Sequence, residues 1–382
     1  GNLTISNTGV NISGGTANLN GNNTIVSGGL TVAGGAANLN GSNTISAGGL
    51  NVSSGSLTVN STNTISGGLN VSGGTATINS SSNSITGGVN ANGGVLVVND
   101  NGGLGNNTIT LNGGSLGAGS VALTNTVSLG SSGGAVTNDS DYTIASRVTL
   151  TGSGNQLTKK GSGNLTLSGG VGTNGTTGSM FLNLQEGTVT LTGAQIKYLT
   201  NSTLNGNLIL SNGIMALRQA SWGGTGQVQV AGTSTWQNSA SANYITNTVN
   251  LLSGATLNLS NSVNLNLVGG LIGTGNVNMT TGSGNLVITG GGFNGTITNN
   301  GTGELRFYES DASGITSFGG STTNQIMFSN SVNRTVGGRI TGSQGLAIRG
   351  SAETAFTNNA NDFTGTVNLA ATAAGATAKF VG

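Results

Sequence analysis

Acidic side chains gather at one place in the sequence in a way that could support acid–base chemistry. The group, with a basic and a phenolic residue between its acids, consists of Glu304, Arg306, Tyr308, Glu309 and Asp311. Cleavage of a glycosidic bond needs one carboxylic acid and a second carboxylate, so polysaccharide cleavage is the activity that such a group could serve. If Leu305 and Phe307 point inward from a strand, however, Glu304 and Arg306 point outward together. This pattern indicates a solvated ion pair, and we expect no catalytic residue here.

Most other catalytic and metal-binding arrangements need residue types that the chain lacks. It contains no His and no Cys, which rules out Ser-His pairs, His or thiolate metal sites and disulfides. Asp139 and Asp141, beside Tyr142, indicate a turn, and calcium-binding repeats would need an Asp in every unit although no acidic residue precedes Asp100. An ice-binding surface would need a regular Thr-x-Thr array, and such triplets are sporadic. We therefore expect no enzyme, no cofactor and no metal.

The composition is far from that of an ordinary globular domain. Only 5% of the residues are charged, against roughly a quarter in typical soluble domains, and the chain has 72 Gly and no Pro. With a formal net charge of +1 and ten Lys and Arg in all, it offers no basic patch for nucleic acid. No run approaches the roughly 18 apolar residues of a membrane helix, so we expect no membrane insertion.

The strongest signal in the sequence is a repeat of about twenty residues that holds for five copies. Three apolar columns recur at this period. They are Ile5, Ile25, Ile45, Ile65 and Ile85; then Val10, Leu30, Leu50, Leu69 and Val89; and then Leu19, Leu39, Val59, Ile78 and Val98. Each unit therefore holds three short alternating strands separated by Gly-rich corners. Strands this short are stable only when coils stack in parallel with copies of themselves, at a spacing of about 4.8 Å.

The polar residues of the repeat also recur in columns. Gly pairs such as Gly28-Gly29 and Gly48-Gly49 are expected to stack at one corner, because Gly accepts the positive φ of a sharp turn. An Asn follows the third strand in every copy and is expected to form a hydrogen-bonded amide ladder. The members of this column are Asn20, Asn40, Asn60, Asn79 and Asn99. We expect these Gly and Asn residues to be structural.

Beyond residue 140 the repeat is less regular, although short alternating strands bounded by Gly or Asn continue. We predict one continuous β-helix over residues 1–382, with regular coils in 1–140 and, in 141–382, less regular coils that carry aromatics and longer loops. At about twenty residues per coil this amounts to roughly 15 to 19 coils and a rod about 70 to 90 Å long. Trp222, Trp236 and Tyr244 are expected to fill the interior of wider coils.

One segment resembles the passenger-associated repeat of bacterial autotransporters, whose pattern is close to LTKxGxGxLTLSG. It runs from Leu157 to Gly170 as LTKKGSGNLTLSGG, and Asn361 to Val367 is similar to the NxFTGxV stretch that often follows that repeat. The resemblance implies a right-handed β-helix, secretion to the bacterial cell surface, and a role as an adhesin or matrix component. No segment after Phe293 has the pattern of the membrane β-barrel that ends an autotransporter. The chain is thus expected to be a passenger cut from its barrel or a free secreted subunit.

These observations together predict an all-β protein, a right-handed parallel β-helix with about twenty residues per three-strand coil. We see no polar cap at either end of the pattern, which predicts end-to-end stacking of copies through a head-to-tail contact that builds a filament. The expected interface residues are Leu3, Ile5, Val10, Ile12, Phe380 and Val381. The leading hypothesis is a subunit of an extracellular fibre. The alternatives are a monomeric surface adhesin or passenger domain, whose partners would be host or cell-surface glycans, and a polysaccharide-active β-helix enzyme.

Overall fold

The structure, a computed structural model, consists of β-strands joined by short turns. It describes residues 2–150, 155–169, 171–173, 180–199, 202–205, 207–217, 221–238, 242–309, 312, 314–320, 325–369 and 377–381. The chain divides into two compact units, Gly1–Val189 and Thr190–Gly382, and strand β26 (Thr188–Leu199) contains the boundary. Every strand pairing whose register the structure describes within these units is parallel, for example β3 (Thr16–Leu19) with β6 (Ala36–Leu39).

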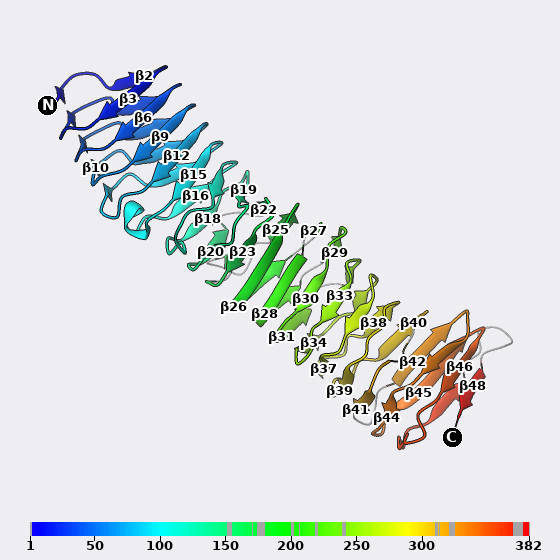
Figure 1. Cartoon of the computed structure of the whole chain (residues 1–382). Helices are drawn as coiled ribbons and strands as arrows, with labels where there is room; N and C mark the ends of the chain where they lie inside the picture. Colours follow the sequence, from blue (N-terminus) through cyan, green and yellow to red (C-terminus); the bar gives the residue numbers. More distant parts are fainter. Residues whose placement is uncertain are drawn as a thin grey trace. The chain divides into compact units, whose positions relative to one another are not determined.

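The first unit is built from three columns of parallel strands, and Figure 1 shows members of the third column side by side. The first column contains β1 (Thr4–Ile5), β4 (Thr24–Ile25), β7 (Thr44–Ile45), β10 (Thr64–Ile65) and β13 (Ser84–Ile85), and further along β20 (Tyr142–Ile144) and β23 (Asn164–Leu167) pair. The second contains β2 (Val10–Ile12), β5 (Leu30–Val32), β8 (Leu50–Val52), β11 (Leu69–Val71), β14 (Val89–Ala91), β16 (Ile109–Leu111), β18 (Val127–Leu129), β21 (Val148–Leu150) and β24 (Val171–Thr173). The third contains β3, β6, β9 (Ser56–Val59), β12 (Thr75–Ile78), β15 (Val95–Val98), β17 (Ser115–Gly117), β19 (Gly134–Thr137), β22 (Asn155–Lys160) and β25 (Met180–Leu184).

The apolar columns of the sequence form the interior of this unit. Ile25, Leu30 and Leu39, one from each strand of the second coil, are at most 1% exposed. Each lies in register with the residue of the same column in the coils before and after it. A 3-10 turn, η1 (Asn101–Leu104), is the one helical segment in the described residues and leaves the strand columns in register.

At the corners formed by glycine pairs, the backbones of successive coils lie in direct contact because no side chain separates them. Gly48 has a φ of +79°, and a Cβ atom placed on it would lie 2.5 Å from the carbonyl carbon of Gly28. A side chain there would require both a strained backbone and a wider spacing between coils. The expected stacking of the Gly pairs at one corner is therefore confirmed.

Two long asparagine ladders follow the coils of the first unit, beside a shorter one at Asn51, Asn70 and Asn90. In the exposed ladder, the amide of each Asn donates to the side-chain oxygen of the Asn one coil earlier, as from Asn40 to Asn20 at 2.8 Å. This ladder was predicted. A second, buried ladder at Asn23, Asn43, Asn63 and Asn83 was not, and it donates the other way, as from Asn23 to Asn43 at 2.7 Å.

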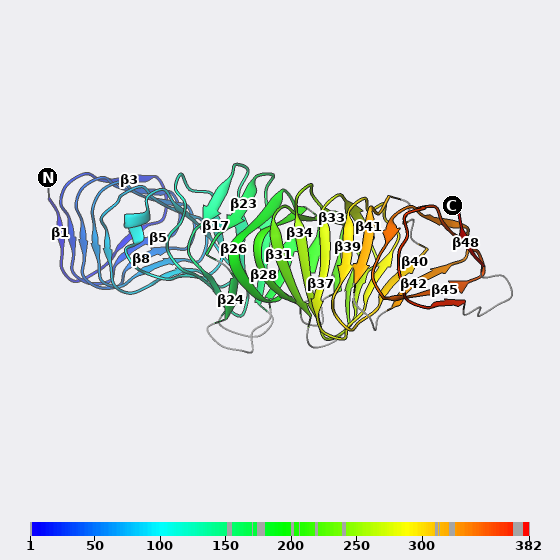
Figure 2. The same cartoon turned by 90° about the horizontal axis from the view of Figure 1, so that it is seen from below.

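The second unit repeats this architecture with longer strands, and Figure 2 shows β31, β34, β37 and β39 side by side. One column contains β27 (Ser202–Leu204), β29 (Ser221–Gly223), β32 (Asn243–Ile245), β35 (Leu265–Leu267), β38 (Leu286–Thr289), β40 (Leu305–Tyr308), β42 (Gln325–Asn330), β45 (Gly345–Gly350) and β47 (Val367–Leu369). Another contains β28 (Asn207–Leu217), β30 (Val228–Val230), β33 (Val249–Leu251) and β36 (Leu271–Gly273). The remaining strands are β31 (Thr233–Asn238), β34 (Thr256–Asn261), β37 (Asn276–Thr281), β39 (Thr296–Asn299), β41 (Ser317–Gly320) and β44 (Arg339–Ile340), with β43 (Arg334–Val336), β46 (Glu353–Phe356) and β48 (Thr377–Phe380) in a separate sheet.

Aromatic side chains fill the wider coils of the second unit. Trp222 and Trp236 are fully buried, with ring centroids 6.2 Å apart, as predicted. The prediction was wrong for Tyr244, which is 50% exposed. Its strand neighbours Asn243 and Ile245 are buried, so the alternation of the strand turns Tyr244 outward.

The predicted fold class is confirmed. In each of the two units the described strands stack as a β-solenoid with about 20 residues per turn, and the two units together hold about 16 turns. The change of character near residue 140 and the single continuous helix over 1–382 stay predictions. Among the described residues, no helix is both long and apolar enough to cross a membrane.

Candidate assembly surfaces

The first coil exposes apolar positions that are buried in the coils that follow it. Ile5, Val10 and Leu19 hold the same register positions as Ile25, Leu30 and Leu39, yet each is only partly buried. Within the described residues, β1, β2 and β3 pair on one side only. A hollow of about 510 Å³ opens there, lined by apolar side chains of the first coil and by Ile25, with polar residues that include Asn18, Asn20, Asn23 and Thr24. We call this the N-terminal surface.

Leu3 breaks the buried asparagine ladder at the N-terminal surface. It lies one coil before Asn23 and donates its backbone N–H to the Asn23 side-chain oxygen at 3.1 Å. Its own side chain is 56% exposed and lines the hollow. A further Asn of the ladder stacked on this coil would find no side-chain acceptor at Leu3, because a Leu side chain cannot hydrogen-bond. The N-terminal surface thus favours an apolar neighbour over another amide.

The last turn of the second unit exposes the corresponding positions at the other end of the chain. Val367 and Leu369 are 43% and 54% exposed, although their register partners Leu346 and Ile348 are fully buried. Phe380 and Val381 are 51% and 41% exposed. We call these four residues, Val367, Leu369, Phe380 and Val381, the C-terminal surface. With Leu3 they make up five of the ten exposed large apolar side chains in the described part of the chain.

Phe380 ends a run of stacked rings. Its ring lies parallel to that of Phe356, with centroids 4.9 Å apart, and Phe356 packs edge-on against Phe328 at 5.7 Å. Phe363 also lies against Phe380 at 6.5 Å. Phe356 is 1% exposed, so the exposure of Phe380 reflects its place in the last described turn.

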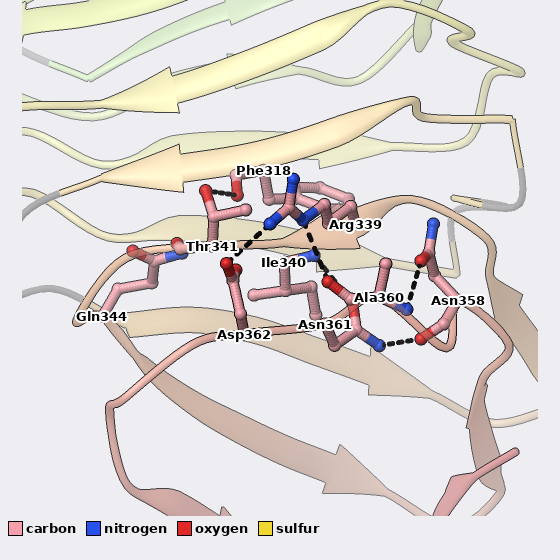
Figure 3. Close-up of polar contacts among 9 residues, drawn as sticks. All are labelled: Phe318, Arg339, Ile340, Thr341, Gln344, Asn358, Ala360, Asn361 and Asp362. Carbon is pink, nitrogen blue, oxygen red and sulfur yellow. Dashed lines mark hydrogen bonds and ion pairs between the residues drawn. The ribbon is translucent and has the colours of Figure 1, made fainter. Parts of the chain in front are cut away.

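A polar network anchors the segment that leads into β47 (Figure 3). Arg339 of β44 donates to the carboxylate of Asp362 at 2.6 Å and to the carbonyl oxygen of Ala360 at 2.9 Å. The Asn361 side-chain oxygen accepts the backbone N–H of Ile340 at 2.8 Å. These contacts join consecutive turns. The stretch around Asn361 that is similar to NxFTGxV therefore holds the chain in place directly before β47.

The six interface residues predicted from the sequence fall into two groups. Leu3, Ile5 and Val10 line the hollow of the N-terminal surface, whereas Ile12 is 7% exposed and does not line it. Phe380 and Val381 belong to the C-terminal surface. The sequence did not single out Val367 and Leu369, although their alternation around Asn368 was the available signal.

Two acidic residues of the cluster that could have supported catalysis, Glu304 and Glu309, form ion pairs. Glu304 contacts Arg306 at 2.6 Å, and Glu309 lies 3.7 Å from Arg334 and accepts the backbone N–H of Ser331. Hydrogen bonding by Ser331, with the charge of Arg334, holds the pKa of the Glu309 carboxyl below its ordinary value. A general acid for glycosidic cleavage needs the opposite shift. Asp311 lies outside the described residues.

Lys159 is a buried cation that the sequence analysis did not identify. It is 0% exposed and lies in register between Val136 and Leu184, inside the solenoid. Its ammonium donates to the carbonyl oxygens of Lys160 at 2.8 Å and Gly161 at 2.5 Å. Burial lowers the pKa of Lys159, while the charges of Asp139 and Glu186 act in the opposite sense. The signal was present in the alternation, which places Lys159 on the same strand face as the buried Leu157.

Comparisons with protein families, with curated proteins and with solved structures find no match to this chain. Within the described ranges, no group of three or more His, Cys, Asp or Glu side chains could hold a metal ion. What the chain does must therefore be inferred from its own residues, and the two terminal surfaces are its most distinctive feature.

Proposed function

We propose that the protein is a secreted structural subunit of the bacterial cell surface, whose copies stack end to end into an extracellular fibre. The observation that carries this proposal is the exposure of core positions on both terminal surfaces. Among the described strands, residues such as Ile5 and Leu369 each pair with one coil only, and their register partners Ile25 and Ile348, which have a coil on both sides, are buried. A coil of a second copy would bury them in the same way.

Both surfaces offer apolar side chains that a partner could bury. The N-terminal surface is hollow and lies in a stretch with no charged residue before Asp100, and the C-terminal surface presents the ring of Phe380. Leu3 in place of an Asn favours an apolar partner, which Phe380 and Val381 supply. The contact is heterologous, so it does not close on itself, and repetition of it builds a filament.

The remaining parts of the proposal follow from the sequence. The nearly uncharged composition and the resemblance of 157–170 to the passenger-associated repeat support export to the cell surface. The ion-paired acids near Glu304 and the lack of His support a role without catalysis. The principal partner is another copy of the chain.

Electron microscopy and sedimentation of the purified full chain test the assembly. We expect long uniform filaments from the wild type, and short separate particles from Leu3→Lys and from Phe380→Lys, because each places a charge in the buried contact. Val332→Lys is the matched control, since Val332 is 51% exposed and lies outside both surfaces. It should leave the filaments intact. A wild type that stays monomeric at all concentrations contradicts the proposal.

A monomeric adhesin or passenger domain is the second candidate, and the repeat-like segment at 157–170 favours it. In that case neighbouring segments of a longer chain would cover the terminal surfaces. Separate particles of one length from the wild type, unchanged by Leu3→Lys, would support this candidate over the fibre.

A further inference from the structure

A polar groove lies on the outer face of the first unit, away from the N-terminal surface. It has a volume of about 300 Å³ and crosses the four strands β17, β19, β22 and β25. Four outward residues in direct register run through it, one from each coil: Ser115, Ala135, Thr158 and Asn183. We call this the side groove.

The side groove is hollow because its side chains change size from coil to coil. Gly113, Ser115, Gly134 and Ala135 leave a low floor over β17 and β19. Longer side chains on the next two coils, including Lys160 and Gln185, form its wall. The groove is therefore a step in an otherwise regular solenoid face.

Several groups in this wall are free to bind a ligand. Among the described residues, the side chains of Lys160, Asn183 and Gln185 have no hydrogen-bond partner, while Gln156 donates to the hydroxyl of Thr158 at 3.1 Å. The lining contains one cation, several amides and hydroxyls, no acid and no aromatic ring. Amides and hydroxyls can each donate and accept, which suits sugar hydroxyls, and a lone ammonium suits a carboxylate.

We propose that the side groove binds an extended acidic polysaccharide, one built from uronic acid units. Parallel strands repeat every ~4.8 Å, close to the length of one sugar unit in an extended chain, so successive coils can contact successive sugars. Without an aromatic ring the groove has no stacking platform for a neutral sugar. The charge of Lys160 therefore selects acidic chains. This site does not depend on the end-to-end assembly.

Isothermal titration calorimetry of the full chain with trigalacturonate tests the site, with cellotriose as the neutral ligand. Trigalacturonate should bind, and cellotriose should bind at least about tenfold more weakly because it lacks the carboxylate that pairs with Lys160. Lys160→Gln and Asn183→Ala should each weaken trigalacturonate binding, the first by about tenfold. The matched control is Arg349→Gln, an exposed cation of β45 outside the groove, which should bind as the wild type does.

Three outcomes would overturn this proposal. They are no binding of trigalacturonate at millimolar concentration, equal binding of cellotriose, and unchanged affinity in both Lys160→Gln and Asn183→Ala. Since both residues lie on the outer face, circular dichroism melting is expected to show folded variants. Filament formation is scored in the same samples, so that loss of binding and loss of assembly are told apart.

Discussion

The ammonium nitrogen of Lys159 lies 2.5 Å from the carbonyl oxygen of Gly161, two residues further along the chain. Gly161 has a φ of +82°, and its carbonyl is turned toward the interior of the coil. The carbonyl oxygens of Lys160 and Asn138 face the same ammonium, at 2.8 and 3.5 Å. A charge in the apolar column is tolerated because the turn supplies it with acceptors, and the same charge holds the turn closed.

Lys159→Met is expected to lower the free energy of unfolding by about 1 to 3 kcal/mol, because it removes the donor from inward carbonyl groups. Chemical denaturation measures this. Lys160→Met is the control, since Lys160 is exposed and should change stability by less than about 0.5 kcal/mol. Equal effects of the two substitutions would contradict the role of the buried ammonium.

The pH dependence of Lys159→Met gives an independent check. Burial lowers the folded-state pKa below 10.5, so just below pH 10.5 the unfolded chain binds more protons than the folded one. The wild type should therefore gain stability relative to Lys159→Met as the pH rises toward 10.5. A constant difference between the two proteins would argue against a desolvated charge.

The burial of Tyr142 is expected to make the protein less stable in strong alkali. Burial raises the pKa of Tyr142 from 10.0 to about 12, and its hydroxyl has no hydrogen-bond partner among the described residues. Between these values the folded state binds more protons, so the stability that is present below pH 10 is lost as the pH rises toward 12. The loss should approach about 2 to 3 kcal/mol. Urea unfolding from pH 9 to 12 measures it, and Tyr142→Phe should remove this part of the decline.

The two asparagine ladders should differ in their effect on stability. Asn43→Ala should cost about 2 to 4 kcal/mol, because the buried backbone N–H and side-chain amide of Asn23 both lose the Asn43 oxygen, and the Asn63 oxygen loses one of its two donors. Asn40→Ala, in the exposed ladder, should cost less than about 1 kcal/mol, because water can replace its partners. Urea denaturation measures the free energy of unfolding of both variants. Similar decreases would mean that burial does not set how much each ladder contributes to stability.

Gly48→Ala and Gly15→Ala separate backbone strain from close packing. Both residues have a positive φ, +79° and +67°, but a Cβ atom on Gly15 would meet nothing within 4 Å. Gly15→Ala should therefore cost about 1 to 2 kcal/mol, for the left-handed backbone alone. Gly48→Ala should cost roughly 1 to 3 kcal/mol more, because the added carbon meets the backbone of Gly28. Equal thermal stabilities would show that the coils can separate without penalty.

The first hundred residues illustrate how much of this fold the sequence alone predicts. The twenty-residue spacing of Ile5 and Ile25 and the Asn20 ladder gave the period, the three strands per coil and the register, because in-register stacking repeats every contact. Beyond residue 140 the strands change length, and the period no longer reports which strands pair.

The features that the prediction missed are polar residues at inward positions and one aromatic residue, Tyr244, at an outward position. Asn23 and Lys159 share strand faces with Ile25 and Leu157, and Tyr244 alternates with the buried Asn243 and Ile245. In each case the alternation along the chain, and not the polarity of the residue, sets whether the side chain points inward. The partners that make Lys159 tolerable are backbone carbonyls, whose direction is set by the turn at Gly161 and is not visible in the side-chain pattern.

Backbone hydrogen bonds in the first unit run from one coil to the next, as from Thr24 to Leu3 at 2.8 Å and from Val26 to Ile5 at 2.8 Å. A pulling force along the stacking direction therefore loads the contacts between coils in series. Each contact bears the whole load, so added coils give length without adding strength, and the weakest junction sets the breaking force. Leu3 supplies no side-chain amide to a neighbour, so in the proposed fibre the junction between copies lacks the buried asparagine contact that joins the second coil to the third, and it is where the fibre would part.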